Sequence, residues 1–220
     1  GPVAAYAYKL LQMQSQAPQR IWIMGPSHRS WFPGVAMADV DGFRTPLGTQ
    51  PVDRDFAQDL AKRQRIFSAI SSPHEPEHCL EVQMPFIQMV YPDVATIPML
   101  FGEVDPMEVS DILKDEVEPN DLIIVSSDLS HYHDNQTAHS LDRSFLDAVI
   151  ANDEKGIRQG EACGQAPVLA LMTIAQSREW EPHLLDYRTS GDRASGLADR
   201  RGRAFPAATG APHHCAGPAR

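Results

Sequence analysis

The chain has 220 residues, of which 42% are hydrophobic and 22% are charged, as is ordinary for a soluble globular protein with a sizeable core. Its formal net charge of −10 argues against non-specific nucleic-acid binding, which needs a basic face to neutralise phosphates. The longest purely aliphatic run, Leu122 to Val125, is far too short for a membrane helix, and the three cysteines are too scattered for a disulfide framework. We therefore expect a cytoplasmic protein with no membrane partner and no visible signal peptide.

The first half of the chain predicts helices and short strands in alternation. Residues 2–14 have the apolar spacing of a helix, and residues 20–28 predict a strand that stops at a Gly-Pro pair. Residues 34–48 predict a second extended segment or hairpin arm, and residues 53–64 predict a helix with an aspartate cap. After a proline-rich loop, residues 79–91 predict a helix that kinks or restarts at its internal proline.

The second half continues the alternation. Residues 94–102 and 121–127 predict buried strands, with a capped helix at 105–117 between them. Two more helices are expected at 137–152 and 164–177. A late strand is expected at 183–191.

Short apolar strands that alternate with helices predict a three-layer αβα sandwich around a mostly parallel sheet. In such folds, ligands bind just beyond the carboxyl ends of the strands. Residues 193–220 differ in kind: five arginines and one aspartate give this segment a charge of +4, which leaves −14 on residues 1–192. We expect one α/β domain over 1–192 and a disordered or aberrant tail over 193–220.

Histidine, aspartate and cysteine gather where the predicted strands end or a helix begins. The candidates are His28 in "GPSH", His78 in "EPEHCLE", Asp128, His131 and His133 in "SSDLSHYHD", and Cys163 in "EACGQAP". A histidine titrates near pH ~6.5, so it can serve as a neutral metal ligand or a proton shuttle. A cysteine at a helix N-terminus favours the thiolate, and an aspartate near a histidine can orient its ring.

Each candidate also has a purely structural interpretation. Any single histidine can be an ordinary surface residue, Asp128 can be a turn or helix cap, and Cys163 can be an inert buried thiol. His131 and His133 lack the strict spacing of a zinc motif, and Cys79 is expected in the core. The joint position of the candidates at strand ends favours a site, but spacing alone leaves its chemistry open.

Five phrases, in order and at sensible separations, are more specific than these spacings: "GPSHRSW", "EHCLEVQMPF", "SSDLSHYHD", "EACGQAP" and "YRTSGD". Together with "FRTPLG" they resemble the Memo family, whose bacterial members are called AmmeMemoRadiSam system protein B. The resemblance covers about residues 1 to 192. It implies a fold similar to class III extradiol dioxygenases, which hold non-haem iron in a facial triad of two histidines and a glutamate.

The matching site of Memo proteins carries two histidines and a cysteine and binds copper or iron. The resemblance makes His28 and Cys163 the metal ligands and His131 the acid/base residue. Asp128 would line the pocket beside it, and His78 would lie in the pocket wall, in contact with the cofactor or behind its ligands. The thiolate makes this site softer than that of the dioxygenases, which favours copper over iron and suits ring cleavage poorly.

Two departures from the family pattern are visible. Members have an N-terminal strand ending in "PHAGY" that supplies the first metal-ligand histidine, and this sequence does not contain it. Members also finish with one more strand after "YRTSGD", whereas here the arginine-rich segment follows. We expect a fold that lacks its N-terminal strand, one absent histidine ligand, and a truncated or frame-shifted C-terminus.

Three functions remain open from the sequence. The first is metal or redox handling, or binding of a small molecule or peptide, within a multi-protein system; the family name implies radical-SAM and AMMECR-type partners. The second is a metal-dependent oxidoreductase of the dioxygenase superfamily in which His131 moves protons for a small substrate. The third is hydrolysis through Cys163 with a histidine base.

Overall fold

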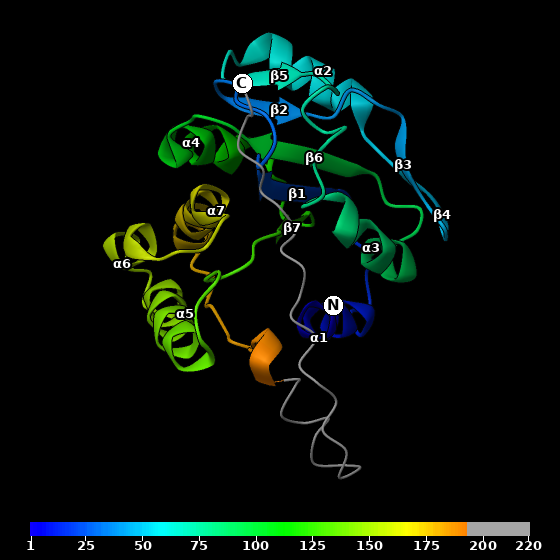
Figure 1. Ribbon diagram of the computed structural model, residues 1–220. Helices are drawn as coiled ribbons and strands as arrows, with labels where there is room; N and C mark the ends of the chain where they lie inside the picture. The colour runs from blue at the N-terminus through cyan, green and yellow to red at the C-terminus, as the bar shows by residue number, and fades with distance from the viewer. Residues whose placement is uncertain (193–220) are drawn as a thin grey trace, which may run out of the picture. The chain divides into compact units, whose positions relative to one another are not determined.

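A five-stranded sheet forms the middle layer of the computed structural model, which describes residues 1–192 (Figure 1). Its strand order is β5-β2-β6-β1-β7, with bounds β1 Ile21–Pro26, β2 Val35–Met37, β5 Phe67–Ala69, β6 Thr96–Phe101 and β7 Leu122–Val125. The pairs β1–β6, β1–β7 and β2–β5 are parallel, and only β2–β6 is antiparallel in this sheet. The strands β3 Gly42–Thr45 and β4 Gly48–Pro51 form a separate antiparallel hairpin.

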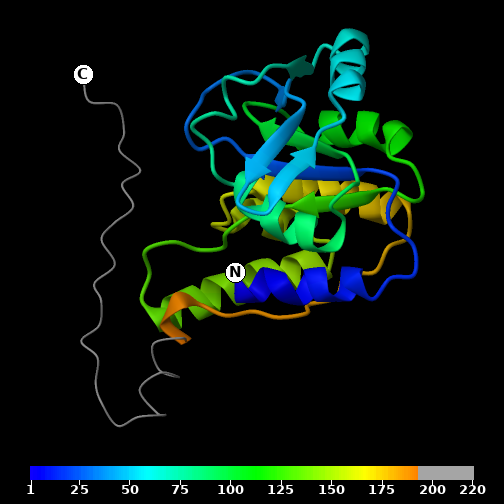
Figure 2. The ribbon, with the colours of Figure 1, turned by 90° about the vertical axis from the view of Figure 1, so that its right-hand side faces the viewer.

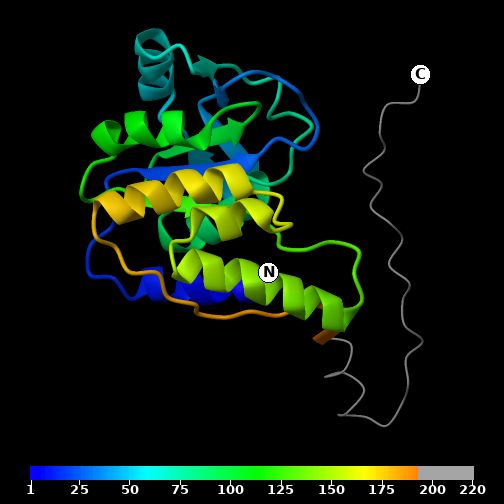
Figure 3. The same cartoon turned by 90° about the vertical axis from the view of Figure 1, so that its left-hand side faces the viewer.

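Helices cover both faces of the sheet. They are α1 Pro2–Gln12, α2 Arg54–Arg63, α3 Met84–Val90 after a 3-10 turn at Glu81–Gln83, α4 Pro106–Glu116, α5 Asn135–Ile150, α6 Glu154–Gln159 and α7 Gln165–Ser177. Figure 3 shows α4 and α7 in front of the sheet, whereas Figure 2 shows α3 and the β3–β4 hairpin on the opposite side. The predicted α/β sandwich with a mostly parallel sheet is therefore confirmed.

The core follows the alternation of side chains along the strands. In β1, Trp22 and Met24 pack in the cluster that contains residues of α2, α4 and α7, and Ile21 and Ile23 pack in the cluster that contains residues of α1 and α3. All four side chains are fully buried. A third cluster joins α5 and α6 to α7. Since β1 is buried on both faces, it holds the residues that follow its carboxyl end in a fixed position.

Several local expectations are met with clear physical causes. The Asp53 carboxylate caps α2 by accepting the Phe56 N–H at 3.2 Å, and Asp105 caps α4 through Met107 N–H at 3.0 Å. The chain restarts as α3 at Met84, directly before the proline. Cys79 lies in the core, as predicted.

Other expectations are wrong. Residues 183–191 form no strand, because no strand among residues 1–192 pairs with them, and Leu184 and Leu185 are exposed. The strand β7 is half-buried rather than buried, since it lies at the edge of the sheet with β1 as its one neighbour there. The short strand β5 and the helix α6 were not expected.

Residues Gly1–Tyr187 form one compact unit, and a second unit begins at Arg188. Within the second unit, Thr189 N–H donates to the Asp192 carboxylate, and Asp192 N–H donates back to the Thr189 hydroxyl. The predicted domain boundary at 192 stays a prediction, and the predicted disorder of 193–220 lies outside the described residues. Among residues 1–192, no helix has both the length and the apolarity to cross a membrane.

Gly34 provides a first test of the fold. Its φ of +80° places it in the left-handed region, and a Cβ there would lie 2.2 Å from the carbonyl oxygen of Ile66. We expect Gly34→Ala to lower the free energy of unfolding by about 2–4 kcal/mol, from backbone strain plus this clash. Gly48→Ala is the control for urea denaturation, since Gly48 has positive φ but open space around its Cβ. Equal losses in the two variants would contradict the clash.

His74 provides a second test, in the loop that leads to the candidate site. Burial lowers the pKa of His74 to about 4, so the ring is neutral at pH 7 and its Nε2–H donates to Ala36 O at 3.1 Å. The unfolded chain, with a His74 pKa near 6.5, takes up the proton first. This stability is therefore present above pH ~6.5 and is lost as the pH falls toward about 4, on the order of 3 kcal/mol in total.

The measurement is urea denaturation of metal-free protein at several pH values between 7.5 and 4. We expect His74→Gln to show a smaller loss of stability over this range than the original chain. His183→Gln is the matched control, because His183 is exposed. An unchanged pH dependence in His74→Gln would show that His74 does not remain neutral in the folded state.

Candidate functional site

The predicted site residues gather at the carboxyl edge of the sheet. His28 lies two residues after β1, and Asp128 lies three residues after β7, the parallel neighbour of β1. Cys163 comes two residues before α7, whose N-cap is Gly164. The expected position beyond the strand ends is therefore the position that these residues occupy.

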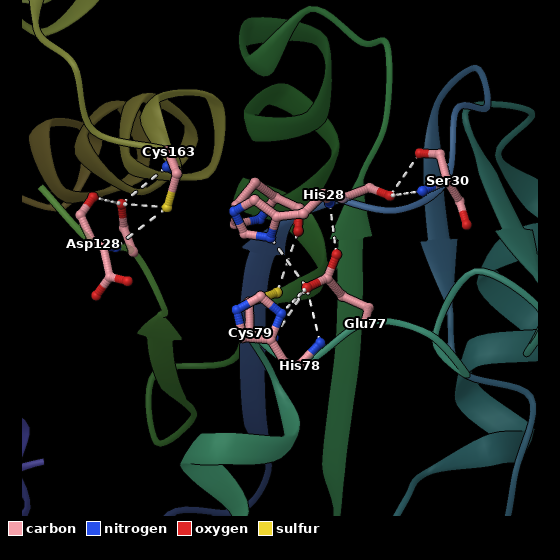
Figure 4. Close-up of polar contacts among 11 residues, drawn as sticks. His28, Ser30, Glu77, His78, Cys79, Asp128 and Cys163 are labelled. Atoms are coloured by element: carbon pink, nitrogen blue, oxygen red, sulfur yellow. Dashed lines mark hydrogen bonds and ion pairs between the residues drawn. The ribbon is translucent and has the colours of Figure 1, made fainter. Parts of the chain in front are cut away.

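The Glu77 carboxylate joins the two histidines of this edge (Figure 4). Its Oε2 accepts His28 N–H at 2.6 Å, and its Oε1 lies 3.0 Å from His28 Nδ1 and 3.0 Å from His78 Nδ1. The same Oε1 accepts the backbone N–H of His78 at 2.8 Å and of Cys79 at 3.2 Å. The ring centroids of His28 and His78 are 5.3 Å apart.

Glu77 is therefore ionised although its side chain is only 2% exposed. Burial by itself would raise the pKa of Glu77, but the hydrogen bonds from His28, His78 and Cys79 lower it to about 2. A carboxylate held by three backbone N–H groups cannot rotate freely. It fixes the orientation of the His28 ring, whose Nδ1 it engages, and lies 3.0 Å from Nδ1 of the His78 ring.

Cys163 is joined to the segment after β7 through Asp128 and Ser127. Asp128 N–H donates to Cys163 Sγ at 3.3 Å, and Cys163 N–H donates to Asp128 O at 3.2 Å. Ser127 Oγ lies 3.7 Å from the same sulfur and accepts Gly164 N–H at 2.9 Å (Figure 4). These contacts pin the start of α7 to the end of β7 and place a backbone N–H donor against the sulfur.

Cys79 lies in the neighbourhood of both groups. Burial chiefly raises the pKa of its thiol, and the charges of Glu77 and Cys163 raise it further. Its Sγ donates to Pro26 O at 3.2 Å. Cys79 is thus a protonated, buried thiol, and Cys163 is the half-buried cysteine, with a backbone N–H donor at its sulfur.

His131 is not brought to this group. Its ring is exposed and lies 6.0 Å from the ring of Tyr132, and no hydrogen bond between described residues joins it to His28 or Cys163. His133 pairs instead with Glu161, Nε2 to Oε2 at 2.6 Å. The carboxylate of Asp128 is exposed, so its backbone, rather than its side chain, contacts Cys163.

The loop that carries His131 is nevertheless anchored from the other side. The buried Asp142 carboxylate accepts Ser130 N–H at 2.8 Å and the Tyr187 hydroxyl at 2.7 Å. The residue directly before His131 is therefore fixed to α5. This anchor acts on the backbone of Ser130 and not on the His131 ring, which is exposed.

Glu77 is the site residue that sequence reasoning missed. The phrase "EPEHCLE" contains three glutamates around His78, and nothing in their spacing distinguishes the buried one. Two surface hollows of the described residues lie elsewhere. One is lined by residues including Asp53 and Ala95 and the other by residues including Gln19 and Asn120, all near the amino ends of strands.

The arrangement offers an imidazole pair and a thiol at one edge of the sheet. The donor atoms of His28, Glu77 and His78 lie within 4.8 Å of one another, and this is the cluster among the described residues suited to a metal ion. Neutral imidazole and thiolate suit copper, zinc and iron better than magnesium or calcium. The roles of the individual residues stay predictions.

Comparisons with known proteins agree with the sequence motifs. The family model of Memo-like proteins matches residues 1–200. A MEMO1 family protein of Methanopyrus kandleri is 32% identical over 206 residues, 87% of this chain and 72% of that protein. Another, of Sulfurisphaera tokodaii, is 27% identical over the same shares of each chain.

Among solved structures, the chain is similar to the uncharacterized protein JW3007 of Escherichia coli K12. The TM-score is 0.51 with 13% identity, over 76% of this chain and 79% of that one. This likeness supports the α/β fold alone. The family model and the relatives carry the identification, and they show that the chain belongs to the Memo family.

Proposed function

We propose that this chain binds a redox-active transition-metal ion, iron or copper, through His28 and Cys163, and that it handles this metal or a ligand beside it. The observation that supports the proposal most strongly is the orientation of His28. Its Nδ1 is engaged by a buried carboxylate, as is usual for metal-binding histidines, and its Nε2 has no hydrogen-bond partner among the described residues.

The residues fit such an ion chemically. Cys163 is half-buried, and its sulfur accepts the N–H of Asp128, so the thiol is held in place at the start of α7. Imidazole together with thiolate forms a soft donor set, which favours copper(I) and also suits iron. A bound ion of this kind would supply Lewis acidity and one-electron chemistry.

The chain's own residues would hold and surround that ion. Glu77 keeps the His28 ring in one tautomer and orientation, and the turn after β1 is closed by Ser27 Oγ donating to Ser30 O at 2.7 Å. His131, on the loop after β7, would take up or release a proton of a bound ligand. Asp128 would present its exposed carboxylate to the same space.

A metal-dependent oxidoreductase of the dioxygenase superfamily is the second candidate. The exposure of His131 favours it, because a solvent-facing imidazole on an anchored loop can exchange protons with a small substrate. Cysteine-dependent hydrolysis is less well supported: Cys163 Sγ is bonded by Asp128 N–H and Ser127 Oγ, and no described histidine lies within hydrogen-bond distance of it. Radical-SAM and AMMECR-type partners and a cytoplasmic location belong to the same proposal.

The test is anaerobic titration of Fe(II) and Cu(I). We expect the chain, or a version extended by a "PHAGY"-type strand, to bind metal stoichiometrically. His28→Ala and Cys163→Ala should each weaken binding by at least ~100-fold, more than the loss of an orienting residue costs. Both variants remove donor atoms, so the loss should be seen with either metal.

Cys79→Ala is the matched control, because Cys79 is the buried, protonated cysteine of the same neighbourhood and should not contribute to binding. If neither the chain nor its extended version binds metal, the proposed function is wrong. If both bind and oxygen uptake follows addition of a small phenolic substrate, the oxidoreductase becomes the better description.

A second test addresses the thiol directly. We expect Cys163 to react with iodoacetamide faster than the buried Cys79 in metal-free protein. Cys163 should be protected when Cu(I) is bound, because a sulfur that coordinates the ion is not available for alkylation. The rates are measured by mass spectrometry of the alkylated peptides. Equal protection of both cysteines would point to a general change in folding and not to metal ligation.

A further inference from the structure

We infer that His78 is a second imidazole ligand of the metal bound by His28 and Cys163, and that Glu77 is the positioning residue that aims both rings at it. This inference rests on the proposed function. It adds a ligand from within the described chain, at a residue that the sequence placed in the pocket wall, in contact with the cofactor or behind its ligands.

The first support is the shared carboxylate. His28 and His78 each place Nδ1 at 3.0 Å from the same oxygen, Glu77 Oε1. An ionised carboxylate accepts only, so the His28 ring donates its Nδ1–H and carries its lone pair on Nε2, and His78 Nδ1 lies within ion-pair distance of the same oxygen. In Figure 4 both rings extend from Glu77 toward the side on which Cys163 is drawn. Two imidazoles thus lie against one anchored carboxylate.

The second support is the separation of the rings. With a metal–nitrogen bond of about 2.1 Å and an angle of roughly 90–110° between the bonds, the centroids of two coordinating imidazoles lie about 4.5–5.3 Å apart. The observed centroids of His28 and His78 are 5.3 Å apart, with the ring planes at 34°. The separation of the two rings therefore lies within the range that a shared ion requires.

Glu77 itself is better suited to orient than to coordinate. Its oxygens already accept three backbone N–H groups, from His28, His78 and Cys79. Coordination by Oε1 would compete with these bonds, and a buried N–H without an acceptor is costly. Its closeness to the two ring nitrogens, all within 4.8 Å, is what an orienting carboxylate requires as well.

The two rings are also accessible to an incoming ion. The His78 side chain is 58% exposed and that of His28 is 25% exposed, whereas Glu77 is 2% exposed. Because the His78 side chain is largely exposed, its truncation removes little packing. A His78→Ala variant is therefore expected to fold as the original chain does.

The experiment uses the full chain and Co(II) as the probe for a transition-metal ion. Co(II) titration followed by optical absorption gives the affinity and, through the sulfur-to-cobalt band, reports Cys163. X-ray absorption of the loaded protein counts the coordinated imidazoles. The variants are His78→Ala and Glu77→Gln, with His183→Ala as the control histidine, and urea denaturation verifies that each is folded.

We expect two imidazoles and one sulfur in the original chain and in His183→Ala, and one imidazole in His78→Ala with affinity reduced at least tenfold. Glu77→Gln should keep the sulfur band but lose about 10–100-fold in affinity, as the loss of an orienting carboxylate does elsewhere.

The outcomes separate the two proposals. One imidazole in the original chain, with His78→Ala unchanged in affinity, would overturn the role of His78 and leave the His28–Cys163 site standing. Unchanged affinity in Glu77→Gln would overturn the positioning role. If the original chain binds no Co(II) and only the extended version does, His78 is not a ligand, whereas absence of binding in both overturns the metal site itself.

Discussion

The hydrogen bonds of the Glu77 carboxylate hold the candidate site together. A buried negative charge is tolerated only where donors satisfy it, and here the donors come from two separate segments, the turn after β1 and the segment that Glu77 begins. Glu77 accepts a hydrogen bond from the backbone N–H of His28 as well as from its ring. The position of the imidazole is therefore set by the backbone of the turn and not only by a flexible side chain.

The sheet supplies the second constraint. β1 and β7 are parallel neighbours in register, so the segments that follow them leave the same edge. Ser126 N–H still donates to Met24 O at 2.8 Å, which extends the pairing beyond β7. The two residues that follow, Ser127 and Asp128, contact the sulfur of Cys163. Its thiol is thus held by main-chain contacts at the start of α7, as His28 is held after β1.

Much of this arrangement follows from the sequence. Apolar strands such as Leu122–Val125 and capped helices such as that after Asp105 carry local signals that tertiary packing does not override. The position of His28 and Cys163 at the sheet edge follows from topology alone. The strand expected at 183–191 failed because strand formation needs a neighbour, and sequence pattern does not reveal whether one is present. The strand β5 was not predicted because it is too short to show a periodic pattern of apolar residues.

Glu77 shows why the connections within the site could not be predicted. A glutamate is most often exposed, and its burial here depends on N–H groups that point to one spot only in the folded chain. His131 illustrates the opposite case: its motif is the more conspicuous, yet its loop is anchored through Ser130 and Asp142, which leaves the ring in solvent. Main-chain donors, invisible in a sequence, thus decide which side chains of this edge are held in place. By that criterion His28 and Cys163 are the positioned residues, whereas the His131 ring is exposed.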